Sequence, residues 1–115
     1  MRTEPDVGYT HDAALLEIEV RTSTDGHIVQ LSGELDLATA SQLSDSVDGL
    51  TLDGSRPVVL DLARLTLCDA AGISAVLRTH RFVTATGGCL VICGASGLVR
   101  RVFNVTGVDT ALDFH

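Results

Sequence analysis

The sequence predicts a single α/β domain in which a mixed β-sheet is packed with helices in the order ββαβαβαβ. Alternating apolar and charged residues near the N-terminus indicate an edge strand. Short continuous apolar runs indicate central strands, and apolar residues three and four apart indicate the helices between them. The length of 115 residues suits one domain, with residues 1–14 expected as a flexible N-terminal tail and residues 15–115 as the domain.

Two strands joined by a tight turn are expected first. Leu16, Ile18 and Val20 alternate with charged residues, which is the period of two of a strand with one wet face, and we expect it at the edge of the sheet. The pair Asp25-Gly26 then provides a turn into His27-Ile28-Val29-Gln30-Leu31. This pattern predicts an antiparallel hairpin.

The first helix and a central strand follow. Thr39 with Gln42 three residues later matches a capping box and predicts a helix over about residues 39–50. After an Asp53-Gly54 turn, residues 58–60 form an apolar run. Such a run is typical of a strand covered on both faces, so we place it at the centre of the sheet.

The second helix is expected from apolar residues three and four apart between Ile73 and Val83. Asp69 is its predicted N-cap, and Gly87-Gly88 ends the pattern. Because a strand precedes it and another follows, this helix crosses between two parallel strands.

A second two-sided apolar strand is expected at residues 89–93. Ser96 is the predicted N-cap of a third helix, which Gly107 ends. Residues 112–114 are then expected as a last short strand that completes the order.

The composition excludes several classes of function. All eight basic residues are Arg, so the chain has no Lys for Schiff-base chemistry or for a Walker-type phosphate loop. A net charge of −7 disfavours direct binding of nucleic acid and of anionic membranes. The sequence shows no apolar stretch long enough to span a membrane and no secretory signal, so we expect a cytoplasmic protein that binds another protein.

Two motifs carry a resemblance to a known family. Gly33-Glu34-Leu35-Asp36, before a Thr-capped helix, resembles the GELD segment in STAS domains of bacterial anti-sigma-factor antagonists. Asp69-Ala70-Ala71-Gly72 occupies the place of that family's Asp-Ser-Ser-Gly or Asp-Ser-Thr-Gly motif. The resemblance implies the STAS fold and a non-enzymatic domain, without a cofactor, that binds an anti-sigma factor, usually a serine kinase, and so releases a sigma factor.

The chain departs from this family at the motif that phosphorylation normally controls. Ala71 stands at the position of the phosphoacceptor, so no phosphoryl group can be attached there. A phosphate carries about −1.5 to −2 charges near neutral pH, enough to end binding at a close-packed interface. We therefore expect a domain fixed in its binding-competent state, with Ser74 and Thr39 among the alternative hydroxyl groups near this end of the fold.

The resemblance also predicts where the partner binds. The expected partner-binding residues are Asp36, Asp69, Ala70, Ala71, Gly72, Ser74 and Arg78. The two aspartates have a second interpretation as helix caps, and Ser74 and Arg78 as solvated polar residues. We expect a monomer or a weak dimer. The alternative function is a STAS subunit of a scaffold or sensor assembly, or the soluble STAS component of a lipid-transport complex.

The remaining chemistry is limited to three cysteines and four histidines. Their spacing fits no zinc site and no catalytic triad, so we expect neither a metal site nor an enzyme. Cys68 and Cys93 end neighbouring strands in the predicted sheet, which makes them a candidate redox pair, whereas buried reduced thiols are the simpler expectation.

Overall fold

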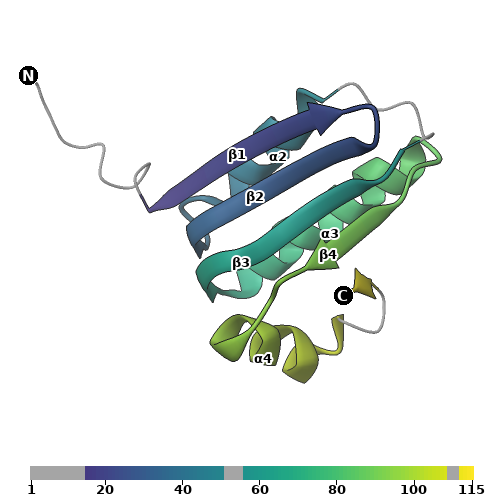
Figure 1. Ribbon diagram of the computed structural model, residues 1–115. Coiled ribbons are helices and arrows are strands. Elements are labelled where there is room, and N and C mark those ends of the chain that lie inside the picture. Colours follow the sequence, from purple (N-terminus) through teal and green to yellow (C-terminus); the bar gives the residue numbers. More distant parts are fainter. Residues whose placement is uncertain (1–14, 51–55, 109–111) are drawn as a thin grey trace, which may run out of the picture.

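The computed structural model describes residues 15–50, 56–108 and 112–115 and has the predicted mixed α/β class and order of elements (Figure 1). Its strands are β1 (Leu16–Ser23), β2 (Gly26–Leu35), β3 (Val58–Cys68), β4 (Leu90–Cys93) and β5 (Asp113–Phe114). Its helices are α2 (Ala40–Asp48), α3 (Ala70–Ala85) and α4 (Gly97–Thr106). The predicted tail at residues 1–14 and the predicted Asp53-Gly54 turn lie outside the described residues.

The strands form one five-stranded sheet in the order β1-β2-β3-β4-β5. β1 stands at one end of this order, so it is an edge strand as predicted. It runs antiparallel to β2, and every other neighbouring pair is parallel. Ser23 pairs with Gly26, which makes Thr24-Asp25 the hairpin loop instead of the predicted Asp25-Gly26. Gly26 belongs to β2 at φ +135°, a conformation that favours glycine.

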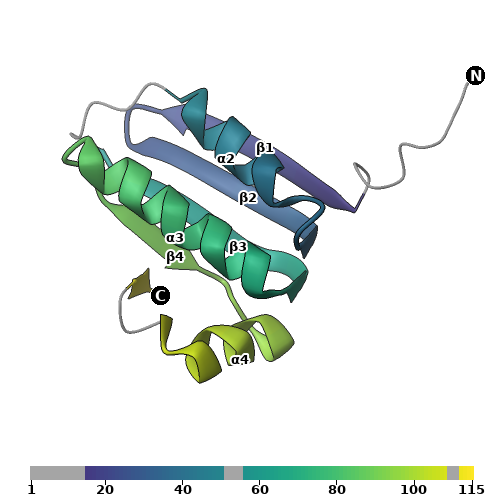
Figure 2. The same ribbon diagram turned by 180° about the vertical axis from the view of Figure 1, so that it is seen from behind.

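Helices α2 and α3 lie against one face of the sheet, and the core is packed between them and the strands (Figure 2). On this face Val29, Leu31, Leu60 and Ile92 are completely buried. The helices contribute Leu43, Val47, Val76, Val83, Val99 and Phe103. Burying each such side chain contributes about 1.5–3 kcal/mol, so the periodicity that predicted the helices also describes the main source of stability.

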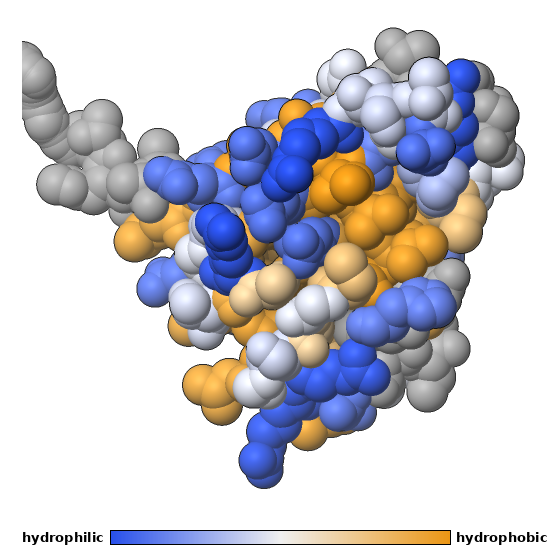
Figure 3. Space-filling view, viewed as in Figure 1, coloured by the Kyte–Doolittle hydropathy of each residue, from blue (hydrophilic) through white to orange (hydrophobic). Residues whose placement is uncertain are grey.

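The opposite face of the sheet corrects the prediction that the strands at residues 58–60 and 89–93 are covered on both faces. Val59 and Val91 are only half-buried there, beside Ile28, which is 40% exposed. Apolar side chains gather over part of this face (Figure 3). The continuous apolar runs therefore reflect an apolar stripe on the open face and not a second layer of helices.

β3 is much longer than the predicted residues 58–60, since it continues to Cys68. Its pairing with β2 shifts register between Gln30 and Ser32 and again between Gly33 and Glu34. Such irregularities interrupt the alternation of side chains, which is why the pattern did not predict the second half of the strand. As a result β2 and β3 end side by side, with Leu35 opposite Cys68.

The ends of α4 fulfil one prediction and correct another. Gly107 has the left-handed conformation at φ +75° and ends the helix as predicted. Ser96 occupies the N-cap position as predicted, but its side chain does not make the expected capping hydrogen bond.

Candidate functional site at the ends of β2 and β3

Two adjacent loops carry the residues that the motifs singled out. We call residues 36–39, after β2, and residues 69–72, which are the N-cap and first turn of α3, the paired loops. The backbone N–H of Asp69 donates to the carbonyl oxygen of Leu35 at 3.2 Å. The Thr66 hydroxyl donates to the carbonyl oxygen of Gly33 at 3.0 Å. These bonds join the ends of the two strands, so the structure brings both motifs together.

Asp36 organises the first of the paired loops. Its Oδ1 atom accepts hydrogen bonds from the backbone N–H groups of Ala38 at 3.0 Å and Thr39 at 3.2 Å. These amides lie at and before the N-cap Thr39, so the Asp36 side chain closes a turn within the loop and makes no bond to the first turn of α2. The interpretation of its side chain as a helix cap is therefore wrong.

Thr39 corrects the predicted capping box. Its hydroxyl donates to the carbonyl oxygen of Glu34 at 2.8 Å and accepts from the N–H of Asp36 at 3.0 Å, and it makes no cap bond to α2. The side chain is completely buried. Thr39 therefore holds the loop from within, and this burial removes it from the accessible alternative phosphosites.

Asp69 begins the second of the paired loops, and its predicted capping role is confirmed. Its Oδ1 atom accepts from the backbone N–H of Gly72 at 2.9 Å, an amide in the first turn of α3. Ala70 is exposed and Ala71 is half-buried directly after this cap. Ala71 thus lies in the first turn of α3, two residues after the capping Asp69 and directly before the buried Gly72.

Gly72 fixes how closely α3 approaches the sheet. A Cβ atom added there would overlap the carbonyl oxygen of Leu35 and lie 2.8 Å from the Cys68 sulfur. Close packing therefore requires glycine at this position, although its φ is not positive. This contact and the Asp69 hydrogen bond both involve the Leu35 carbonyl, so one backbone group positions both paired loops.

The surface of the paired loops is apolar and acidic. Neither loop contains a basic residue. Leu37 is 82% exposed and Leu67, at the end of β3, is 42% exposed. The sequence interpretation missed both leucines, although a leucine within a short loop of small and polar residues is a signal of contact with a partner. This combination suits a protein partner with an apolar patch and basic groups.

Ser74 and Arg78 are both exposed on α3. Arg78 lines a groove between α2 and α3 together with Phe82, whose side chain is 38% exposed. Eight residues separate Ala70 from Arg78, about 12 Å along the helix. The structure therefore places Arg78 beyond the paired loops, whereas Ser74 is one turn from Ala70.

The structure does not bring the candidate redox pair together. Cys93 pairs with Asp61, while Cys68 pairs with Leu35 and lies seven residues beyond Asp61 along β3. At about 3.3 Å per residue these positions are roughly 20 Å apart, far beyond the reach of a disulfide. Burial, followed by the negative charge of Asp69, raises the pKa of Cys68 to about 12, so its thiol is neutral near pH 7.

Residues 15–50, 56–108 and 112–115 contain no group of three His, Cys, Asp or Glu side chains arranged to hold a metal ion. The described helices are all too short or too polar to cross a membrane.

Comparison with known proteins agrees with this arrangement. A family model described as "Mlab, STAS domain" matches residues 18–113. The anti-sigma-B factor antagonist of Staphylococcus aureus (strain NCTC 8325 / PS 47) is 28% identical over 93 residues, which cover 81% of this chain and 86% of that protein. The corresponding antagonist of Staphylococcus epidermidis is 29% identical over the same length, with the same shares covered.

Solved structures share the fold. An anti-sigma factor antagonist from Mycobacterium paratuberculosis superposes with a TM-score of 0.76 at 21% identity, over 87% of this chain and 85% of that one. The unphosphorylated form of the anti-sigma factor antagonist SpoIIAA gives 0.65 at 21% identity, over 86% and 87%. With the family match extending over most of the described strands and helices, the chain belongs to the STAS domain family.

Proposed function

We propose that the protein is an anti-sigma-factor antagonist that binds an anti-sigma factor through the paired loops and so releases a sigma factor in the cytoplasm. Curated relatives with this role, 28–29% identical, support the proposal. The observation that carries it is the placement of Ala71 in the first turn of α3, close to Asp69, which caps this helix, and to the loop of Asp36. The role is one of binding, without catalysis.

The alanine at position 71 makes this antagonist independent of phosphorylation at that site. A phosphate there would stand beside Asp69 and close to the loop of Asp36, in a surface with no basic residue in either paired loop. Like-charge repulsion and desolvation would both oppose a bound partner. Alanine keeps the surface small and neutral, so an anti-sigma factor with kinase activity has no means of ending the interaction through residue 71.

The partner-binding residues divide by chemistry. Leu37 and Leu67 provide exposed apolar area, and Ala70 and Ala71 allow close approach of the partner. Asp36 and Asp69 would face basic groups of the partner while Asp36 holds its own loop and Asp69 caps α3. Gly72 acts from beneath the surface, Ser74 borders it, and Arg78 lies further along α3 in the groove with Phe82.

The test is a pull-down from cell extract, with mass-spectrometric identification of bound proteins, followed by affinity measurement on the recovered partner. Wild type should recover an anti-sigma factor, and Ala71→Glu, which puts a charge at the phosphoacceptor position, should bind it at least 10-fold more weakly. Ala85→Glu is the matched control, because Ala85 is exposed at the opposite end of α3. Equal affinity of Ala71→Glu and Ala85→Glu would show that the paired loops are not the binding surface.

A second variant tests the loss of the switch. Ala71→Ser restores a hydroxyl group at the phosphoacceptor position. With a kinase-type partner and ATP, intact-mass analysis should show one added phosphate on Ala71→Ser and none on wild type. Phosphorylation of wild type under the same conditions would mean that another residue, such as the exposed Ser74, has taken over the switch.

One observation favours a second candidate function, a STAS subunit within a larger assembly or lipid-transport complex. Leu98 and Val105, seven residues apart on α4 and hence on one side of it, are 73% and 77% exposed. Such a stripe suits a second contact surface. If the pull-down yields a multi-subunit complex without an anti-sigma factor, and Leu98→Ser abolishes it, the assembly role replaces the antagonist role.

A further inference from the structure

β1 is the first strand of the sheet, at its upper edge in Figure 1, and no other strand within the described residues pairs with its outer side. In an antiparallel pair, alternate residues direct their N–H and C=O groups to the neighbouring strand. Glu34 N–H donates to the Leu15 carbonyl, so the odd-numbered residues of β1 face β2. The even-numbered residues, Leu16 to Thr22, therefore present their backbone groups at the free edge.

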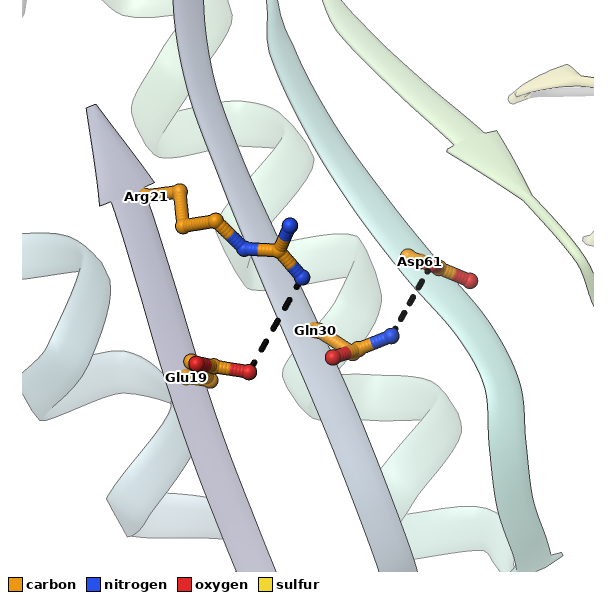
Figure 4. A network of polar contacts seen from close by, with 4 residues as sticks. All are labelled: Glu19, Arg21, Gln30 and Asp61. Atoms are coloured by element: carbon orange, nitrogen blue, oxygen red, sulfur yellow. Dashed lines mark hydrogen bonds and ion pairs between the residues drawn. The ribbon is translucent and has the colours of Figure 1, made fainter. Parts of the chain in front are cut away.

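This edge lacks the devices that usually block further strand pairing. β1 is eight residues long, contains no Pro or Lys, and pairs with β2 without a register shift. Its charged side chains stand on the face of the sheet and do not project from the edge, because side chains alternate between the two faces. Figure 4 shows Glu19 and Arg21 on the same face as Gln30 and Asp61 of the neighbouring strands.

The helix-facing side of β1 leaves apolar area uncovered at this edge. Val20 pairs with Val29, and Ile18 pairs with Leu31. Val29 and Leu31 are completely buried, whereas Ile18 is half-buried and Val20 is 37% exposed. A strand added beside β1 would cover both side chains and extend the core.

The charges on β1 identify a second copy of this chain as that strand. Glu19 and Arg21 are 68% and 62% exposed and contact each other at 3.8 Å across Val20. If β1 pairs with β1 of another copy so that Val20 lies opposite Val20, each Glu19 lies opposite the other copy's Arg21. Opposite charges at directly paired positions stabilise a sheet, and like charges destabilise it.

No neighbouring register pairs opposite charges without also pairing like charges. Moving the pairing by two residues in one direction places Glu17 opposite Arg21 but also Glu19 opposite Glu19, and in the other direction it places Arg21 opposite Arg21. Moving it by one residue turns the apolar side chains of one copy to the other copy's polar face. The charge pattern thus selects the pairing centred on Val20.

We propose that the protein forms a homodimer by antiparallel pairing of two β1 strands centred on Val20, which joins two five-stranded sheets into one. The twofold axis at Val20 places the paired loops of the two copies at opposite ends of the joined sheet, because β1 begins at the end where β2 stops. Each copy therefore keeps its own paired loops accessible. The dimer is independent of the proposed function.

Sedimentation equilibrium on the full chain, over a range of concentrations, tests this pairing by charge exchange. Wild type should show a reversible dimer. Glu19→Arg and Arg21→Glu should each weaken it at least 10-fold, since each variant brings like charges together twice. The double variant, Glu19→Arg with Arg21→Glu, should restore it, and an equimolar mixture of the two single variants should form a heterodimer.

Circular dichroism and thermal melting control for folding, since an exposed pair such as Glu19–Arg21 contributes little to stability. A wild type that stays monomeric at millimolar concentration overturns the proposal. So do single variants that dimerise as wild type does, or a mixture that fails to associate.

Cross-linking tests the register separately. Val20→Cys should cross-link efficiently with a short bis-maleimide in a Cys89→Ser/Cys93→Ser background, because the two introduced thiols face each other. Thr22→Cys is the control, since its two copies would be about 13 Å apart along the strands. Equal cross-linking of both variants would contradict pairing centred on Val20.

Discussion

The backbone N–H of Asp69 donates to the carbonyl oxygen of Leu35, so the residue that caps α3 is bonded to the residue that ends β2. The same carbonyl lies directly beneath Gly72. The separation of the paired loops is therefore set by backbone atoms, and side chains such as Ala71 can vary without changing it. Four predictions concern the residues that maintain this geometry.

Gly72→Ala should destabilise the fold by about 1–3 kcal/mol, because the added methyl group would overlap the Leu35 carbonyl and crowd the Cys68 sulfur. Gly49→Ala is the matched control, with an added Cβ 3.7 Å from its nearest neighbours and an ordinary φ of −77°. Urea unfolding of both variants measures the difference. A loss for Gly72→Ala no larger than that for Gly49→Ala would show that α3 can move away from β2.

Thr39→Val should lower the free energy of unfolding by about 1–3 kcal/mol. Valine fills the same volume but leaves the Glu34 carbonyl and the Asp36 amide without their hydroxyl partner in a buried place. Thr39→Ser keeps the hydroxyl group and should retain most of the stability. Chemical denaturation compares the two, and a valine variant as stable as the serine variant would refute the role of the hydroxyl.

Asp69→Ala should destabilise the fold by about 0.5–2 kcal/mol through loss of the cap on Gly72. Asp69→Asn keeps a capping oxygen and removes the charge, so its stability should stay near that of wild type. Binding of the proposed partner separates the two roles of Asp69. If its charge contacts basic groups, Asp69→Asn should bind more weakly at unchanged stability, most clearly at low salt.

Stability should fall as the pH rises above about 9, in part because of Cys68. Burial and the charge of Asp69 raise the pKa of this thiol to about 12 from an ordinary value of 9.0, so the unfolded chain loses the proton first. Between these values the folded state binds more protons, and the loss is at most about 1.4 kcal/mol per pH unit. Unfolding at pH 8 and 10.5 should show a smaller loss for Cys68→Ala than for wild type. Identical losses would mean that other groups cause the decrease in stability at alkaline pH.

The sequence predicted those parts of the fold that depend on local signals. The edge position of β1 follows from its alternation, the start of α3 from Asp69, and the end of α4 from Gly107. In each case a short pattern carries the physical cause within a few residues. The two motifs likewise predicted the paired loops, because they occupy the ends of adjacent parallel strands.

The sequence did not predict features that depend on tertiary contacts. The extension of β3 to Cys68 is concealed by register shifts, and the open face is concealed by the apolar side chains of Val59 and Val91. Thr39 matched a capping box, yet its hydroxyl bonds to Glu34 and Asp36, and the N–H of Gln42 donates to the Thr39 carbonyl oxygen and not to its hydroxyl. Which of two suitable oxygens bonds to an amide is decided by packing around the loop and not by spacing.

The order of strands in the sheet equals their order along the chain. As the protein leaves the ribosome, each new strand therefore meets a partner that has already been synthesised, beginning with the β1–β2 hairpin. None of the described strands has to insert between two neighbours that are already paired, so folding can proceed in the direction of translation. The sheet grows from one side only, and the short β5 is the last strand to be added.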